Sequence, residues 1–345
     1  RDTGTLQLEG EWELDLFGRQ RALLDAAIGQ SRAAQADAQA ARLLLSAQVA
    51  RAYVQLARWL AQKEVVQRTL AQREEVLGLI RQRVQGGLDT TVELRQSEGA
   101  LPDVRQQIEA VDEQIALARH ALAALSGQPP AATLNLSPAI QALKLMDVPK
   151  NLPMDLLARR ADIMAARWRA GTPNTHIFII IDLVAFAGYN AIGLDRLLLA
   201  GSRQFGLFPA IHLPLFDGDR RRANLQGSVA EQDAAVATYN QAVVEAVHEV
   251  ADQLSSVDSL GRQRLEQQAA QTSAESAYDL ALQRYRAGLG SYLMVLNAET
   301  AVLNQRRLGV DLQARAMEAQ VALVRAIGGR APSPETTPSP SGDRS

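Results

Sequence analysis

The feature that most limits how this chain can fold is a pair of very long stretches without proline. They run from 20 to 84 and from 219 to 286, and both keep a helical spacing of apolar residues. At about 1.5 Å per residue, the first stretch predicts a helix about 95 Å long. A helix of this length needs packing along its whole length. The sequence therefore predicts a mainly helical protein in which long helices pack side by side.

Each long stretch is followed by a glycine-containing turn and a second helical stretch. The first returning stretch ends at Gly127, and the second runs from 300 to 327 before a Gly-Gly pair. Along the first, apolar residues alternate spacings of three and four, which is the heptad seam of a coiled coil. The seam consists of Leu101, Val104, Ile108, Val111, Ile115, Ala118, Leu122 and Leu125. The sequence thus predicts two long helical hairpins.

The two hairpins are copies of one unit. The stretch RVQGGLDTTVELRQSE (83–98) returns as RYRAGLGSYLMVLNAE (284–299), which aligns Gly87 with Gly288 and Glu98 with Glu299. LDLFGR precedes the first hairpin, and LPLFDGDRR precedes the second. These correspondences indicate an internal duplication of about 110 residues.

The duplication divides the chain into four parts. The first repeat covers 1–127 and the second covers 176–329, with a middle segment at 128–175 and a Pro/Ser-rich tail at 330–345 that is expected to be disordered. Within the first repeat we expect a strand at 4–16 and a hairpin at 19–126 with its tip near 86–92. Within the second we expect strands at 176–190 and 204–216 and a hairpin at 219–327 with its tip near 287–293. The middle segment is expected to contain a short helix at Met154–Arg167.

The first strand alternates strictly between apolar and polar residues. One face carries Leu6, Leu8, Trp12, Leu14 and Leu16, and the other carries Gln7, Glu9, Glu11, Glu13 and Asp15. Alternation of this kind predicts a strand with one apolar side. Taken alone, it is equally compatible with a soluble sheet and with a membrane barrel.

Composition excludes several classes of function. The net charge of −2 and the low aromatic content argue against nucleic-acid binding, and the absence of cysteine excludes disulfides and thiolate sites. The histidines are far apart and have no metal-ligand spacing, so neither a metal site nor a cofactor is expected. The chain shows no catalytic arrangement of side chains. No apolar run reaches about 18 residues, so no transmembrane helix is expected.

Three strands are too few to close a barrel, and open strand edges must be paired or covered. Several copies of the chain could pool their strands into one closed sheet. In such a barrel the apolar faces would contact lipid. The opposite faces would then line a water-filled lumen with Glu9, Glu11, Glu13, Asp182 and His212.

Several stretches resemble the TolC-type outer-membrane efflux family, most closely its OprM/NodT-like lipoprotein branch. They follow the family order along nearly the whole chain: WELDLFGR (12–19), LPMDLLARRADIMAAR (152–167), FAGYNAIGLDRLL (186–198), LPLFDGDRRRANL (213–225), RYRAGLGSYLMVLNAE (284–299) and ALVRAIGG (322–329). Each stretch is weak alone, but the ordered set is specific.

The resemblance implies a homotrimer in the outer membrane of a Gram-negative cell, extending into the periplasm. Its protomers would share one transmembrane β-barrel and one long α-barrel of coiled-coil hairpins. The duct would contact outer-membrane lipid, a periplasmic adaptor (membrane fusion) protein and an inner-membrane pump. It would passively export drugs or other small solutes, with no enzymatic activity.

The sequence departs from the family pattern in two places. The family has a lipobox cysteine, a helical segment and a further strand before the position of WELDLFGR, so the resemblance implies an amino-terminally truncated chain. After 167, WRAGTPNTHIFIII replaces the usual helix and Phe-Phe-Pro sequence. Ala161 stands where the family has Pro, and Arg167 stands near a usual acidic residue.

By position, the resemblance assigns the periplasmic tip and gate to Gly87, Val92, Gln96, Gly288, Leu293, Asn297 and Thr300. Leu293 is similar to the constricting apolar residue of the family. Asn297 and Thr300 stand where an acidic residue and a basic partner are common, and Glu299 is a candidate substitute for the missing charge. An alternative is that Leu293 and Asn297 are ordinary helix-start residues. The alternative for the whole chain is a soluble structural coiled-coil scaffold.

Overall fold

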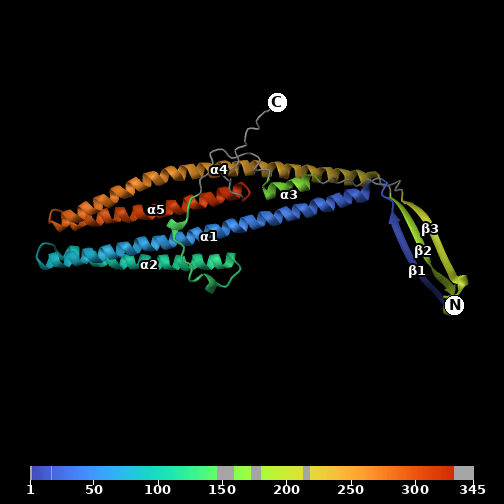
Figure 1. The fold of residues 1–345 in the computed structure, drawn as a ribbon, viewed down its shortest axis with the longest axis horizontal. Coiled ribbons are helices and arrows are strands. Elements are labelled where there is room, and N and C mark those ends of the chain that lie inside the picture. The colour runs from blue at the N-terminus through green and yellow to red at the C-terminus, as the bar shows by residue number, and fades with distance from the viewer. Residues whose placement is uncertain (1, 17, 146–158, 172–179, 213–217, 330–345) are drawn as a thin grey trace, which may run out of the picture. The chain divides into compact units, whose positions relative to one another are not determined.

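The computed structural model describes residues 2–16, 18–145, 159–171, 180–212 and 218–329 (Figure 1). The predicted tail at 330–345 lies outside these residues. By contacts the chain divides into two compact units, residues 1–38 with 161–244 and residues 39–160 with 245–345. The main elements, in chain order, are β1 (Thr3–Glu13), α1 (Arg19–Gln85), α2 (Thr91–Leu125), α3 (Ala161–Ala170), β2 (Ile180–Ile192), β3 (Arg203–His212), α4 (Gly218–Arg286) and α5 (Tyr292–Ala326).

The prediction of a mainly helical protein with a small sheet is confirmed. α1 has 67 residues and α4 has 69, so each is about 100 Å long at about 1.5 Å per residue. The start of α1 is fixed by Asp15, whose carboxylate accepts hydrogen bonds from the backbone N–H groups of Gln20 (3.0 Å) and Arg21 (3.2 Å). Arg19 also pairs with Glu13 at 2.7 Å, which links the end of β1 to the first turn of the helix.

The first unit contains an antiparallel sheet with the strand order β1-β2-β3. Thr3 lies opposite Ile192 at one end of the β1–β2 pair, and Glu13 lies opposite Asp182 at the other. β2 pairs with β3 from Ile180 opposite His212 to Tyr189 opposite Arg203. β1 and β3 are therefore the edge strands. Parts of the second and third predicted strands, 176–179 and 213–216, lie outside the described residues.

The short helix α3 packs on α1 within the same unit. The Arg32 guanidinium lies 4.5 Å from the centroid of the Trp168 ring, and Arg169 forms an ion pair with Asp37. Ile163, on α3, is buried. α3 begins later than the predicted Met154–Arg167, and residues 154–158 of that prediction lie outside the described residues.

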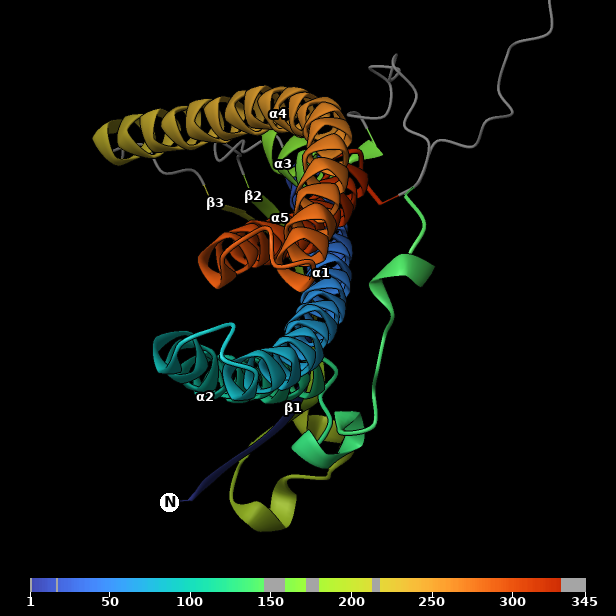
Figure 2. The same cartoon turned by 90° about the vertical axis from the view of Figure 1, so that its left-hand side faces the viewer.

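The second unit holds α2, α5 and the parts of α1 and α4 from residues 39 and 245 onward, which form the two helical hairpins α1–α2 and α4–α5. Their turns lie at the same end of this unit and face the viewer in Figure 2. Within each hairpin the seam is apolar: Leu56 of α1 packs with Val111 and Ile115 of α2, and Leu260 of α4 packs with Leu312 of α5. A third apolar cluster joins the hairpins through α1 and α5, and it consists of Val54, Ala57, Ala61, Ile140, Ala314 and Met317.

Candidate functional site

The two hairpin turns have the same backbone geometry. Gly87 has φ +69° and Gly288 has φ +76°, so both occupy the left-handed region that glycine adopts without strain. In the first turn, Gly87 N–H donates to the carbonyl of Val84 and Leu88 N–H donates to that of Arg83; the equivalent bonds recur 201 residues later. This pair of hydrogen bonds is the Schellman motif that ends a helix. Gly87 and Gly288 therefore terminate the two long helices.

Replacing Gly87 or Gly288 with alanine is expected to lower the free energy of unfolding by about 1–2 kcal/mol, because a Cβ is strained in this conformation. Chemical denaturation followed by circular dichroism measures the change. Gly86→Ala is the matched control, because Gly86 lacks a positive φ and a Cβ there would meet its nearest atoms at 3.6 Å. An equal loss in all three variants would contradict this explanation.

A polar network joins the two turns. Arg83, at the end of α1, donates from Nε to Asp89 Oδ2 at 2.8 Å and from Nη1 to the backbone carbonyl of Tyr285 at 3.1 Å. The Tyr285 hydroxyl of α4 donates to Asp89 Oδ2. The Arg83 guanidinium also lies 4.7 Å from the centroid of the Tyr285 ring. These three side chains therefore connect the first hairpin to the second at the tip.

The protonation states of this network fix its donors and acceptors. Burial opposes ionisation of Asp89, but the hydrogen bonds from Arg83 and Tyr285 outweigh it and lower the pKa of the carboxyl group. Burial, followed by the hydrogen bond to Asp89, raises the pKa of the Tyr285 phenol. At neutral pH the phenol is therefore a donor and the carboxylate an acceptor.

An apolar cluster with three tyrosines lies beside the network. It contains Val76, Ile80, Tyr278, Tyr285, Tyr292, Val295 and Val302, from α1, α4 and α5. The rings of Tyr285 and Tyr292 lie 6.3 Å apart between centroids in a tilted arrangement, which is a favourable aromatic geometry. Tyr285 is among the largest fully buried side chains in the described residues. The hairpins are thus held together at the tip by both apolar and polar contacts.

The structure places the predicted gate residues on the exposed surface of the two turns. Val92 is 60% exposed and Leu293 is 57% exposed, and both lie in the first turn of a returning helix. Gln96 and Asn297 are exposed at the corresponding positions one helical turn later. Thr300 is exposed too, and its hydroxyl donates to the carbonyl of Leu296 at 2.8 Å. Leu293, Asn297 and Thr300 therefore share one face of α5.

The candidate substitute for the missing gate charge, Glu299, is not on that face. Its side chain is buried and pairs with Arg73 of α1 at 2.9 Å. The helical spacing of the sequence could have predicted that Glu299 is buried. Tyr292, Val295, Glu299 and Val302 recur every three or four residues, and all four are buried. The interpretation of Glu299 as an exposed gate charge was therefore wrong.

The links at the tip could not be identified from the sequence. Asp89 and Tyr285 are 196 residues apart, and neither neighbourhood contains a motif for their contact. Tyr285 does occupy a position where the repeats differ, since Val84 is its counterpart. This difference between the repeats is the one local feature of the sequence that indicates an additional role for Tyr285.

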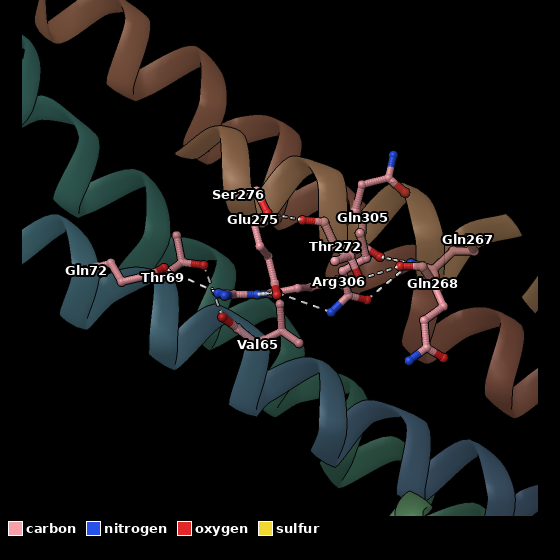
Figure 3. Close-up of polar contacts among 11 residues, drawn as sticks. Val65, Thr69, Gln72, Gln267, Gln268, Thr272, Glu275, Ser276, Gln305 and Arg306 are labelled. Atoms are coloured by element: carbon pink, nitrogen blue, oxygen red, sulfur yellow. Dashed lines mark hydrogen bonds and ion pairs between the residues drawn. The ribbon is translucent and has the colours of Figure 1, made fainter. Parts of the chain in front are cut away.

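A second polar cluster joins three helices farther from the turns (Figure 3). Arg306 of α5 donates to Glu275 of α4 at 2.8 Å and to Gln72 of α1 at 3.4 Å. Gln267 of α4 donates to the backbone carbonyl of Gln305 at 2.7 Å. The hydrogen bond from Arg306 lowers the pKa of Glu275. Polar contacts therefore link the hairpins well beyond the tip.

In the sheet, the register places all five of the predicted lumen residues at positions of the same parity. Glu9, Glu11 and Glu13 alternate along β1, and Asp182 of β2 lies opposite Glu13. His212 lies at the end of β3, opposite Ile180.

The face that carries these carboxylates also carries apolar residues. Val184 lies opposite Glu11, and Phe186 lies opposite Glu9. Phe208 pairs with Val184 in the register, and the rings of Phe186 and Phe208 stack with centroids 5.8 Å apart. The reason is that β2 carries apolar residues at both parities, whereas β1 alternates.

The opposite face of the sheet is apolar and strongly exposed. Leu8 is 80% exposed, Trp12 is 67% exposed and Phe205 is 87% exposed. Large apolar patches on a protein surface mark contacts with lipid or with other proteins.

In the described part of the chain, no group of three His, Asp or Glu residues could hold a metal ion. No helix among the described residues has the length and hydropathy needed to cross a membrane.

Comparison with known proteins assigns the chain to a family. The family described as outer membrane efflux protein matches residues 2–128 and 152–329. Outer membrane protein OprJ of Pseudomonas aeruginosa is 35% identical over 327 residues, which cover 92% of this chain and 68% of OprJ. The toluene efflux pump outer membrane protein TtgF of Pseudomonas putida is 32% identical over 93% of this chain and 68% of its own length.

Solved structures show the same fold. The outer membrane protein VceC of Vibrio cholerae superimposes with a TM-score of 0.87 at 37% identity, over 95% of this chain and 80% of VceC. The structure of CusC gives a TM-score of 0.88 at 27% identity, over 95% of this chain and 78% of CusC. The matched regions contain both hairpins and the sheet. The chain therefore belongs to the outer membrane efflux protein family.

Proposed function

We propose that the protein is the outer-membrane duct of a tripartite efflux system, through which drugs or other small solutes leave the periplasm passively and without catalysis. The observation that carries this proposal is the family match across both hairpins and the sheet. Family membership also favours a duct over a soluble coiled-coil scaffold. A relative described as part of a toluene efflux pump supports a role beside a periplasmic adaptor and an inner-membrane pump.

The sheet supports assembly from several copies. Because β1 and β3 are its edges, the sheet needs further strands at both sides, as unprotected edges require, and neighbouring protomers would supply strands to close it. In a homotrimer the strands would form one shared β-barrel. The exposed face with Leu8 and Phe205 would contact outer-membrane lipid. Glu9, Glu11, Glu13, Asp182 and His212 would then lie on the lumen side.

The internal duplication supports a six-membered tip. Three chains with two hairpins each would bring six turns together, each ended by a glycine such as Gly87 or Gly288. Val92 and Leu293 would then form an apolar ring, with the uncharged Gln96, Asn297 and Thr300 behind it. All five side chains are exposed in one chain. The duct would therefore close mainly through apolar contacts.

Conductance across a planar lipid bilayer tests this function without a partner protein. The purified protein is expected to give discrete conductance steps in potassium chloride, because a water-filled duct passes ions without an energy source. The control is Gly86→Ala, which leaves the strands unchanged. Protein that inserts into the bilayer in its folded state but passes no current would contradict the proposal.

A further inference from the structure

The exposed apolar face of the sheet ends in a row of residues that carries a cation. Antiparallel pairing arranges this face in rows of three residues, one from each strand. Two successive rows, in order toward the end of the sheet, are Leu8–Ala187–Phe205 and Leu6–Tyr189–Arg203. Arg203 is exposed, as is Phe205. The apolar face therefore ends at a phenol and a guanidinium group.

This end of the sheet is the one away from the long helices. β1 continues into α1 at Arg19 and β3 precedes α4, which begins at Gly218, so both helices leave the sheet at its other end (Figure 1). In an outer-membrane duct whose helices extend into the periplasm, Arg203 would therefore lie at the outer leaflet. Along β1, the six-residue step from Trp12 to Leu6 spans about 20 Å, compared with an apolar band of about 25 Å on membrane barrels. Arg203 thus stands at the border of that band.

A second arginine lies at the same end of the sheet, in the loop between β2 and β3. The hydroxyl of Ser202, which precedes Arg203, donates to the backbone carbonyl of Arg196 at 2.8 Å. At the start of this loop, Gly193 N–H donates to the carbonyl of Asp2 at 2.7 Å, which ties the loop to the start of β1. Two cations are therefore held close to the last row of the apolar face.

Neither guanidinium group is engaged by a strong contact within the protein. Arg196 lies 3.8 Å from Asp195, and these side chains are 72% and 80% exposed, so water screens the pair and leaves it weak. Within the ranges that the structure describes, no hydrogen bond or ion pair involves the side chain of Arg203. Both groups can therefore bind an anion from outside the chain.

The same loop exposes large apolar side chains. Leu198 is 73% exposed and Leu199 is 56% exposed, and Ile192 at the end of β2 is 64% exposed. Apolar surface of this kind is unfavourable in water, whereas at a membrane border it can contact acyl chains while arginine side chains reach the headgroups. The combination of leucines and arginines is complementary to an anionic lipid.

We propose that Arg203 and Arg196 bind the phosphate groups of an outer-leaflet lipid whose acyl chains contact the apolar face of the sheet. This inference rests on the proposed outer-membrane duct. A guanidinium group suits this ligand because it can donate two parallel hydrogen bonds to phosphate oxygens. The position also suits arginine, because a cation on the lipid side of a barrel costs far less at the border than at the midplane. The phosphorylated glycolipid of the outer leaflet supplies both the phosphates and the acyl chains.

Binding of lipid A, a diphosphorylated and multiply acylated sugar, tests the proposal in protein extracted from outer membranes in detergent. Native mass spectrometry measures the fraction of particles that retain lipid A as its concentration is varied. Arg203→Gln is expected to weaken binding about tenfold or more, because it removes a charge-assisted hydrogen bond. Arg203→Lys keeps the charge and should recover part of the affinity.

Arg95→Gln is the matched control. It removes an equal charge from α2, where the Arg95 side chain is 82% exposed, and should leave lipid A binding unchanged. Equal losses in Arg203→Gln and Arg95→Gln would overturn the proposal, because they would reflect the net charge alone. Loss of the trimer mass in Arg203→Gln would also overturn it, because it would assign this end of the sheet to a contact between protomers.

The chemistry of the probe separates recognition of phosphate from contact with acyl chains. Lipid A from which both phosphates have been removed should bind the unsubstituted protein about tenfold more weakly or worse, and Arg203→Gln should not weaken it further. Inorganic phosphate alone should fail to displace lipid A, because it lacks the acyl chains. Equal retention of lipid A with and without its phosphates would contradict the proposed site.

Failure of this inference can be distinguished from failure of the duct function. Bilayer conductance of the unsubstituted protein tests the duct alone. If conductance steps are present but lipid A binding does not depend on Arg203, the lipid site is wrong and the duct function stands. If folded, inserted protein passes no current, the duct function itself is wrong, whatever lipid the protein retains.

Discussion

Replacing Tyr285 with alanine is expected to lower the free energy of unfolding by about 3–5 kcal/mol, as for other large buried aromatic side chains. The residue is 1% exposed and packs in the apolar cluster between the hairpins. Its loss would also remove a hydrogen bond to Asp89. The two hairpins would therefore separate more easily at the tip. Urea denaturation followed by circular dichroism measures the loss.

Two further variants divide this effect into its parts. Tyr285→Phe keeps the ring and removes only the hydroxyl, so a loss of about 1.5–3 kcal/mol is expected for a hydrogen bond to a charged group. Leu289→Ala changes a residue in the same turn that is 71% exposed, and it should change stability by less than about 0.5 kcal/mol. Equal losses in Tyr285→Ala and Leu289→Ala would contradict the role of the cluster.

Replacing Leu8 with arginine is expected to reduce the amount of protein in the outer membrane severely. Leu8 belongs to the exposed apolar face of β1, which we propose to contact lipid. An arginine on the lipid face of a barrel costs about 2–4 kcal/mol near the bilayer midplane. Three copies of the chain would multiply this cost. Quantitative immunoblotting of outer-membrane fractions measures the outcome.

Gln7→Arg is the matched control for this prediction. Gln7 is the neighbour of Leu8 on the opposite face, and its side chain donates to Glu9 at 2.8 Å. An arginine there would lie beside carboxylates in the proposed lumen and should be tolerated. If both variants lose membrane protein equally, or if neither does, the assignment of the two faces is wrong.

The long helices could be predicted because their signal is local and repeated many times. A proline-free stretch with apolar residues every three or four positions has few alternatives to a packed helix. The alternation in β1 likewise predicted which residues share a face. The faces of β2 could not be predicted in this way. Its apolar residues occur at both parities, so the pattern does not show which residues lie on the apolar face of the sheet.

Contacts between the hairpins could not be predicted, because they join residues far apart in the sequence. The pairing of Asp89 with Tyr285 and of Arg73 with Glu299 depends on how two hairpins pack. The helical phase of α5 nevertheless separates Glu299 from Asn297. If this helical periodicity is applied to each residue of the stretch, it places Glu299 in the core and Leu293 on the surface.

The mass of the native particle tests the proposed trimeric outer-membrane duct most directly. Protein extracted from outer membranes in detergent can be measured by size-exclusion chromatography with multi-angle light scattering, corrected for bound detergent. A trimeric duct should have a protein mass of three chains of 37.4 kDa each. A particle with the mass of one chain, recovered without detergent from the soluble fraction, would contradict it.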